Sequence, residues 1–351
     1  MFVLDTKRFC ATMLSKGDAL MKKQLLPQVA RYFKTNLHTH TTISDGKLTP
    51  EQTKAEYQKR GYQILSITDH HVIVDHSALN DESFLCLTGI EVDLHHADYR
   101  SGIDGGAYHL NLIAKRPDNL WSPAPCIHCY PGGFDYEPTI TYEGLDHLGS
   151  VKTAQAMIDA ANEHGFLVMY NHPIWSCHSY PDYAPLNGLW AIELRNSTSC
   201  VCGLNENNER VFKDMLTLGK RVYPVGADDM HSLASLGQSY IMLGAEKLTY
   251  DSVITALENG DFYMSCGPEI LELSIEGNEV FVRCSEAAAI TLQTSGRFAR
   301  RITGDDVTSA TFNLEPFLQK CDRENMFIYV TVTAADGSYA TTRAYFAAEL
   351  R

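Results

Sequence analysis

Asn36-Leu-His-Thr-His-Thr-Thr-Ile-Ser-Asp-Gly46 is the stretch around which the rest of the chain is organised. His38 and His40 stand two residues apart, and Asp45 follows five residues later with a glycine behind it. Residues i and i+2 of a strand point to the same face, so the two imidazoles can bind one metal ion. We therefore expect a strand that carries both histidines, with Asp45 in the loop beyond its end.

The composition limits the classes of function. The chain has 351 residues, a hydrophobic fraction of 44% and a formal net charge of −14. The length predicts two domains, one of them large. The acidic balance argues against an extended nucleic-acid surface, which needs stripes of Lys and Arg, but it allows a small anionic substrate where metal ions supply positive charge.

The same features indicate a compartment. No apolar run approaches the roughly 20 residues that span a bilayer, and the first residues do not form a signal-peptide pattern. Ten scattered cysteines are typical of reduced thiols in a cytosol. We expect a cytoplasmic protein without a membrane partner, and the sequence leaves its oligomeric state open.

Hydrophobic periodicity divides the chain into three parts. Residues 1–34 have apolar side chains at helical spacing and predict an N-terminal helical extension packed on the main domain. Residues 35–265 alternate strand and helix about seven times, which predicts a parallel α/β architecture and favours a barrel over an open sheet. The irregular insertion Lys115–Asp146 is interpreted as a loop over the active face. Residues 266–351 alternate at period two and predict a smaller, sandwich-like antiparallel β domain.

Candidate metal ligands recur beside the ends of six of the seven proposed strands. In chain order they are His38 and His40 with Asp45, then His70, Glu91, His109, His172, and Asp229 with His231. A barrel gathers its chemistry at the carboxyl ends of its strands, and imidazole with carboxylate suits zinc, manganese or iron. A lone buried histidine is more often a hydrogen-bonded core residue, so the argument depends on the joint placement. Nine candidate ligands favour two or three ions, with a carboxylate such as Glu91 bridging two of them.

Other polar residues near these ends have less specific interpretations. Asp69 is interpreted as a group that orients a neighbouring ligand. Asp228 competes with Asp229 as the ligand at the last strand. Arg195, at the end of the sixth strand, is our candidate contact for a substrate phosphate, with a structural salt bridge as its alternative. His178 is a weaker candidate for the same pocket.

These motifs resemble the PHP family, named for its polymerase and histidinol phosphatase members. The residues that carry the resemblance are His38-Thr-His40, Ser44-Asp-Gly46, Thr68-Asp-His70, Glu91, His109, His172-Pro173 and Asp229-Met-His231. The resemblance implies a distorted (β/α)7 barrel with a two- or three-metal centre. It assigns His38, His40, Glu91 and Asp229 to one ion, Glu91, His109 and His172 to a second, and Asp45, His70 and His231 to a third.

The expected activity is hydrolysis. Clustered ions lower the pKa of a bridging water and stabilise charge on the attacked group, which suits phosphate esters best. We expect a phosphoesterase that acts on a small phosphorylated metabolite or nucleotide through a metal-bridging hydroxide, with Glu91, Asp229 and His231 as catalytic residues. Two alternatives stay open, namely amidohydrolase-type cleavage of a C–N or acyl bond, and a non-catalytic metal-binding module.

Overall fold

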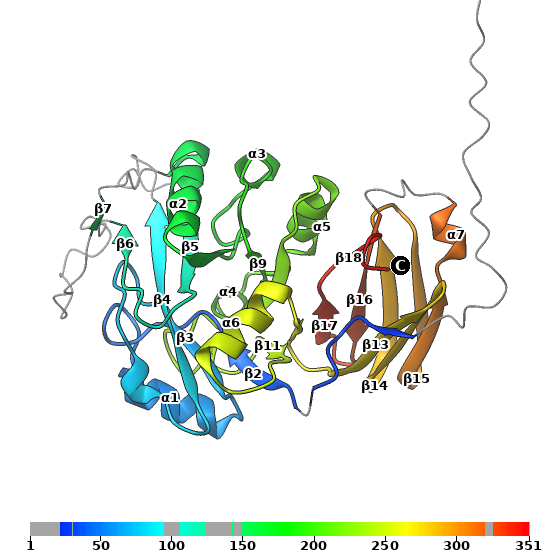
Figure 1. Cartoon of the computed structure of the whole chain (residues 1–351), viewed down its shortest axis with the longest axis horizontal. Coiled ribbons are helices and arrows are strands. Elements are labelled where there is room, and N and C mark those ends of the chain that lie inside the picture. The colour runs from blue at the N-terminus through cyan, green and yellow to red at the C-terminus, as the bar shows by residue number, and fades with distance from the viewer. Residues whose placement is uncertain are drawn as a thin grey trace, which may run out of the picture.

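The computed structural model describes residues 22–29, 31–94, 106–123, 142–143, 149–319 and 326–350. These residues form a mixed α/β fold with one large sheet and few helices. In Figure 1 the helices α1 to α3 gather around one part of the sheet, and strands β13 to β16 lie beside that part.

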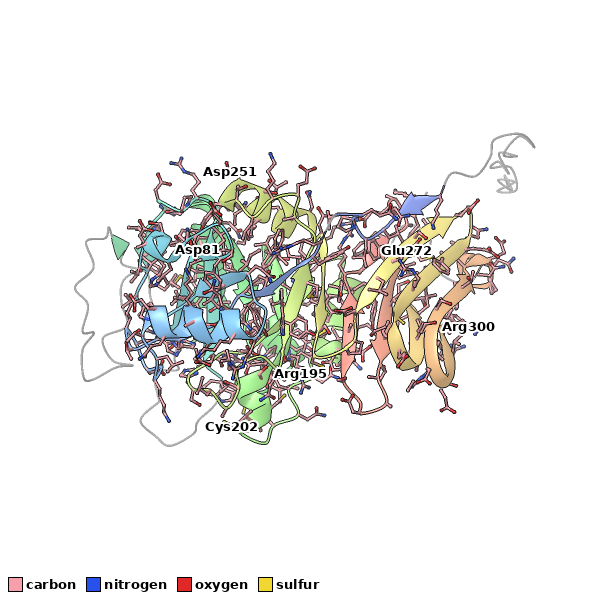
Figure 2. The ribbon with its side chains drawn as sticks, turned by 90° about the horizontal axis from the view of Figure 1, so that it is seen from below. Asp81, Arg195, Cys202, Asp251, Glu272 and Arg300 are labelled. Atoms are coloured by element: carbon pink, nitrogen blue, oxygen red, sulfur yellow. The ribbon has the colours of Figure 1, made fainter. Side chains whose placement is uncertain are left out.

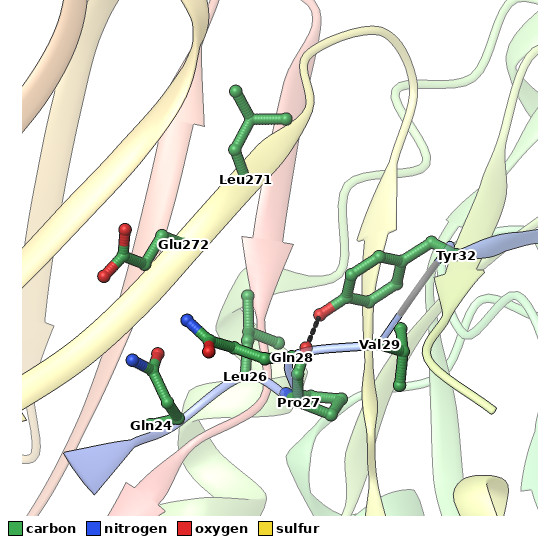
Figure 3. Close-up of a pocket in the computed structure, with 8 residues that line it drawn as sticks. All are labelled: Gln24, Leu26, Pro27, Gln28, Val29, Tyr32, Leu271 and Glu272. Atoms are coloured by element: carbon green, nitrogen blue, oxygen red, sulfur yellow. Dashed lines mark hydrogen bonds between the residues drawn. The ribbon is translucent and has the colours of Figure 1, made fainter. Parts of the chain in front are cut away.

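The described N-terminal residues are extended, so the expected helix does not reach through residue 34. Strand β1 (Lys23–Gln24) pairs antiparallel with β13 (Ile270–Glu276). Leu25 and Leu26 pack into the C-terminal hydrophobic cluster and not onto the main domain. In Figure 3 the Tyr32 hydroxyl donates to the carbonyl of Pro27 at 2.7 Å. Residues 1–21 lie outside the described part of the chain.

Seven strands build the α/β part of the sheet. In spatial order they are β2 (Phe33–Asn36), β3 (Ile64–Ile67), β4 (Leu85–Leu94), β5 (Tyr108–Ala114), β8 (Phe166–Tyr170), β9 (Ala191–Asn196) and β10 (Tyr223–Ala227). The expectation of a wholly parallel arrangement is wrong, because β5 runs antiparallel to both β4 and β8. Antiparallel neighbours need no crossover helix, which accounts for part of the shortage of helices.

The segments that follow the first and the last of these seven strands, β2 and β10, contact each other. Thr39 and Met230 form an isolated parallel bridge, and the amide of His40 donates to the carbonyl of Met230 at 3.0 Å. Strand β2 ends at Asn36, so His38 and His40 follow the strand and are not part of it.

The helices begin where local chemistry favours them. Helix α1 (Pro50–Lys59) has the expected capping box, in which Thr49 and Gln52 satisfy each other's backbone amides. Helix α6 (Tyr250–Asn259) ends at Gly260 with a left-handed φ of 69°. The remaining helical segments are η1 (Ser77–Leu79), α2 (Val151–Glu163), α3 (Tyr180–Tyr183), α4 (Ser197–Val201), α5 (Glu209–Thr217) and α7 (Glu315–Leu318). No helix in the described ranges is long and apolar enough to cross a membrane.

The C-terminal strands continue the same sheet. Strands β11 (Tyr240–Leu243) and β12 (Phe262–Ser265) connect β2 to β17 through antiparallel pairing. The remaining strands of this part are β14 (Glu279–Thr294), β15 (Ala299–Asn313), β16 (Phe327–Thr333), β17 (Tyr339–Thr342) and β18 (Tyr345–Phe346). The main hydrophobic cluster fills the α/β part and extends to Phe327, Tyr329 and Phe346 of the C-terminal strands, and a second cluster fills the rest of those strands.

The insertion lies largely outside the described residues. Its described pieces include β6 (Ser122–Pro123) and β7 (Tyr142–Glu143), which pair in parallel.

Candidate metal centre

The first group of candidate ligands joins residues from both ends of the strand array. The Nε2 atoms of His38 and His40 lie 3.1 Å apart. Glu91 Oε2 lies 3.1 Å from each of these nitrogens, and Asp229 Oδ1 lies 3.2 Å from the first and 3.0 Å from the second. Metal–ligand bonds of about 2.0–2.1 Å place neighbouring ligand atoms roughly 3.0–3.4 Å apart. All five distances therefore match the edges of one coordination polyhedron.

Hydrogen bonding around this group leaves lone pairs pointing inward. His38 Nδ1 lies 2.6 Å from Glu193 Oε1, so a proton on Nδ1 leaves the lone pair on Nε2. Within the described part of the chain, Asp229 Oδ1 is buried and accepts no hydrogen bond. A buried carboxylate oxygen without a donor is costly, and a metal ion would compensate it. The donor set thus fits a divalent ion.

A second group lies between β3, β4 and β5. His70 Nδ1 and His109 Nδ1 approach Glu91 at 3.3 and 3.1 Å, and they approach Asp93 Oδ1 at 3.0 and 3.2 Å. His109 is near the start of β5, not at the end of a strand. The reversed direction of β5 brings it to the same edge as the carboxyl end of β4, where it pairs with Asp93.

The third group is more open. Asp45 Oδ2 lies 3.2 Å from His231 Nε2 and 3.8 Å from His70 Nε2, and Asp45 Oδ1 lies 3.5 Å from His40 Nδ1. The side chains of Asp45 and His231 are 35% and 30% exposed, whereas those of His38, His40 and Glu91 are at most 1% exposed. A substrate would therefore reach the centre from the side of Asp45 and His231.

His172 lies beside the second group. Its Nε2 is 3.4 Å from Glu91 Oε1, and its backbone amide donates to Glu193 Oε2 at 2.9 Å. His172 and Asp229 have positive φ values of 23° and 51°. Such strain in non-glycine residues clusters at functional sites, and it is observed here at two candidate ligands.

The structure separates ligand candidates from supporting carboxylates. Asp69 accepts from the amide and hydroxyl of Thr41, both at 2.7 Å, and from Ser44 at 2.8 Å, so it holds the loop that carries Asp45. Asp228 accepts from three backbone amides between residues 237 and 239 at 2.7–3.0 Å. Asp229, and not its neighbour, therefore faces the first group.

Two functional side chains were missed as parts of the site. Asp93 follows Glu91 by two residues on β4 and so shares its face, the same spacing that singled out His38 and His40. Glu193 lies in β9, and no sequence pattern links it to His38. The signal for Asp93 was present in the sequence.

The charges of the site depend on one another. Burial alone would raise the pKa of Glu91, but the imidazoles of His38 and His70 outweigh it and hold that pKa well below its usual range. Burial opposes protonation of His40, yet Asp229 and Glu91 raise its pKa to about 10. The buried carboxylates thus require positive charge, which protonated imidazoles or divalent ions supply.

Arg195 and His178 make other contacts, although the charge of His178 interacts with those of His109 and His172. Arg195 interacts with Tyr339 and with the thiols of Cys200 and Cys266, and Figure 2 shows it on the side that faces the C-terminal strands. Its contact with a substrate phosphate stays a prediction. His178 is in contact with the Tyr170 hydroxyl.

Trp175 packs against His109 of the second group and the neighbouring His172. Its ring lies edge-on to those of His109 and His172, with centroids 5.1 and 4.9 Å away, and it is 45% exposed. The backbone amides of Ile174 and Trp175 donate to the buried Glu206 at 3.0 and 2.9 Å, which fixes this loop.

Three solved structures show what this chain is similar to. A two-domain protein from Bacteroides vulgatus that contains a predicted PHP-like metal-dependent phosphoesterase is 16% identical, with a TM-score of 0.44, over 92% of this chain and 98% of its own. An amidohydrolase from Chromobacterium violaceum with bound sulfate and no metal is 15% identical, with a TM-score of 0.37. A suggested metal-dependent phosphoesterase from Bifidobacterium adolescentis is 17% identical, with a TM-score of 0.34. The last two each cover 57% of this chain and 88% of their own.

Similarity at this level carries no argument about activity. No curated protein matches the chain. The model of the PHP domain matches residues 36–170, the segment that holds His38, His40 and Glu91. The resemblance predicted from the motifs is thus confirmed: residues 36–170 match the PHP domain family.

Proposed function

We propose that the chain is a metal-dependent phosphoesterase that hydrolyses a small phosphorylated metabolite or nucleotide. The observation that carries the proposal is the convergence of three ligand groups that share members. Glu91 belongs to the first and second groups, and His70 belongs to the second and third. A purely structural metal site is usually closed and mononuclear, so shared ligands with one open side favour catalysis.

The charges around the candidate ligands also support a metal-dependent phosphoesterase. Among the described residues, Asp45, Glu91 and Asp229 pair with imidazoles, and no lysine or arginine forms an ion pair with them. An anionic ester would therefore need positive charge from bound ions. Two or three divalent ions, with zinc, manganese or iron as candidates, would lower the pKa of a bound water and stabilise charge on the phosphoryl group.

The chain's own residues would hold this arrangement. His38, His40, Glu91 and Asp229 would hold the buried ion. Asn196 Nδ2 donates to Asp229 Oδ2 at 3.1 Å, which keeps Oδ1 directed at the imidazoles. His231, partly exposed and 3.2 Å from Asp45, is positioned to exchange a proton with solvent at the open side.

We interpret strands β2 to β10 as a distorted barrel, with residues 266–351 as an appended β domain. The bridge between Thr39 and Met230 supports closure, because it connects the first and last strands of the seven. The cytoplasmic location stays a prediction from the sequence.

A substrate panel tests the proposal. The metal-free protein is reloaded with Mn²⁺ or Zn²⁺ and assayed on phosphate monoesters, phosphodiesters and amides. We expect metal-dependent hydrolysis of at least one phosphate ester, seen as free phosphate from a monoester or as the released alcohol from a diester, and no amide cleavage. Amide cleavage would support the amidohydrolase alternative, and two or more bound ions without any turnover would favour a binding module.

A further inference from the structure

Asp93 is a buried carboxylate surrounded by imidazoles. Its Oδ1 lies 3.0 Å from His70 Nδ1 and 3.2 Å from His109 Nδ1, and its Oδ2 lies 3.3 Å from His71 Nε2. Asp93 itself is 1% exposed. A carboxylate has about four acceptor positions, so one side chain can serve three rings.

His70 presents its two nitrogens to two different groups. Nε2 points toward Asp45 and Nδ1 toward Asp93. A neutral imidazole has one lone pair and one N–H, so it binds an ion through one nitrogen and donates through the other. The choice between them decides which group receives His70 as a ligand.

The geometry favours Nε2 as the ligand atom. The distance of 3.0 Å between His70 Nδ1 and Asp93 Oδ1 is that of a hydrogen bond, whereas 3.8 Å between Nε2 and Asp45 is too long for one. His38 provides a parallel, because Glu193 accepts from its Nδ1 at 2.6 Å while Nε2 faces the first group. A carboxylate that accepts from a metal-binding histidine fixes both its tautomer and its ring orientation.

We propose that Asp93 is a positioning residue that fixes the Nδ1–H tautomer of His70, so that His70 binds the ion of the third group through Nε2. Asp93 would then be part of the centre without being a ligand. The inference rests on the proposed metal dependence, and it is independent of which ester is cleaved.

Two substitutions of similar shape separate positioning from ligation. In Asp93→Asn the amide oxygen still accepts a hydrogen bond from His70, whereas Asp93→Leu removes this acceptor and leaves Glu91 Oε2, 3.3 Å from His70 Nδ1, as the nearest carboxylate oxygen. We expect both full-length variants to bind as many Mn²⁺ ions at saturation as the unsubstituted protein. The weakest-bound ion should lose about 10- to 100-fold in affinity in the leucine variant and only a few-fold in the asparagine variant. Equilibrium dialysis measures both quantities.

Asp228→Asn is the matched control, because Asp228 is also a buried aspartate beside the site but bonds backbone amides and Ser197. It should leave the affinity for Mn²⁺ within a few-fold. Loss of one ion per chain at saturation in both Asp93 variants would show that Asp93 is a ligand. Unchanged affinity in both would show that it has no role in binding.

A second measurement needs no substitution. In the Zn²⁺-loaded protein with ¹⁵N-labelled histidine, His70 should show a protonated Nδ1 and a metal-bound Nε2. The reverse tautomer would overturn the proposal even if the variants failed to fold. Failure of the unsubstituted protein to bind Mn²⁺ or Zn²⁺ would instead refute the proposed metal dependence.

Discussion

Replacing Glu91 by glutamine tests the sharing of one carboxylate between two ligand groups. Oε2 of Glu91 faces His38 and His40 at 3.1 Å, while Oε1 faces His109 at 3.1 Å and His172 at 3.4 Å. Glutamine keeps the shape but has a single ligand oxygen and no charge. Both groups should therefore lose affinity together.

The expected size of the effect follows from linkage. An ion present at 1,000 times its dissociation constant stabilises the folded protein by about 4 kcal/mol. With an unfolding entropy of about 2.1 cal/mol/K per residue, a chain of 351 residues converts this into a rise in melting temperature of about 5–6 °C. Glu91→Gln should abolish that rise. Losing several kcal/mol of charge stabilisation in the transition state should also lower kcat/KM roughly a thousandfold.

Calorimetry with and without Mn²⁺ measures the rise in melting temperature, and metal analysis after dialysis counts the bound ions. Glu206→Gln is the matched control, since Glu206 is equally buried but bonds the backbone amides of Ile174 and Trp175. The control should keep the metal-induced rise. If Glu91→Gln retained full metal content and the full rise, the sharing of this carboxylate would be refuted.

Three further predictions concern the surroundings of the centre. Gly46→Ala should weaken the binding of one ion at least tenfold in a dialysis assay. The Cβ of the alanine would lie 2.4–2.6 Å from backbone atoms and displace the loop that carries Asp45. Unchanged affinity would show that the loop adapts. Asp229→Asn should remove the buried ion. Asp228→Asn should keep the ion but lower the free energy of unfolding by about 1–3 kcal/mol, because it weakens hydrogen bonds to backbone amides. Metal counting and chemical denaturation measure the two effects, and loss of the ion in Asp228→Asn but not in Asp229→Asn would contradict the prediction. Burial lowers the pKa of His178 to about 4, so the NMR shifts of its ring protons should not change with pH above about pH 5. Because the pKa of His178 is lower in the folded than in the unfolded protein, its contribution to the free energy of unfolding is fully present above pH 6.5 and is lost as the pH falls towards 4.

The sequence predicted which candidate ligands come together better than it predicted the strand directions. His38, His40, Glu91 and Asp229 form one group, with His38 and His40 after β2, Asp229 after β10 and Glu91 within β4. His109 illustrates the difference, since it was placed at the end of a parallel strand but lies near the start of a reversed one. Hydrophobic periodicity reports which residues are buried and gives no direction for the strand.

Residues whose roles depend on long-range contacts were the least predictable. Arg195 lies near the carboxyl end of β9, yet its neighbours Tyr339 and Cys266 are more than 70 residues later in the sequence. The sequence predicted a helix in residues 1–34. In the described part of this range, Lys23 and Gln24 instead form a strand that pairs with β13. Local pattern cannot weigh such tertiary pairings, which override intrinsic propensity.

The first ligand group depends on a contact between segments about 190 residues apart in the sequence. The amide of Asp229 donates to the carbonyl of His38 at 2.9 Å, and the amide of His40 donates to Met230 at 3.0 Å. These two bonds set the backbones from which three of the four ligands extend. Because they form only when the seven-strand array has assembled, we expect a partly folded chain to lack a high-affinity ion site. Metal binding at this group should therefore stabilise the assembled array as a whole and not any single strand.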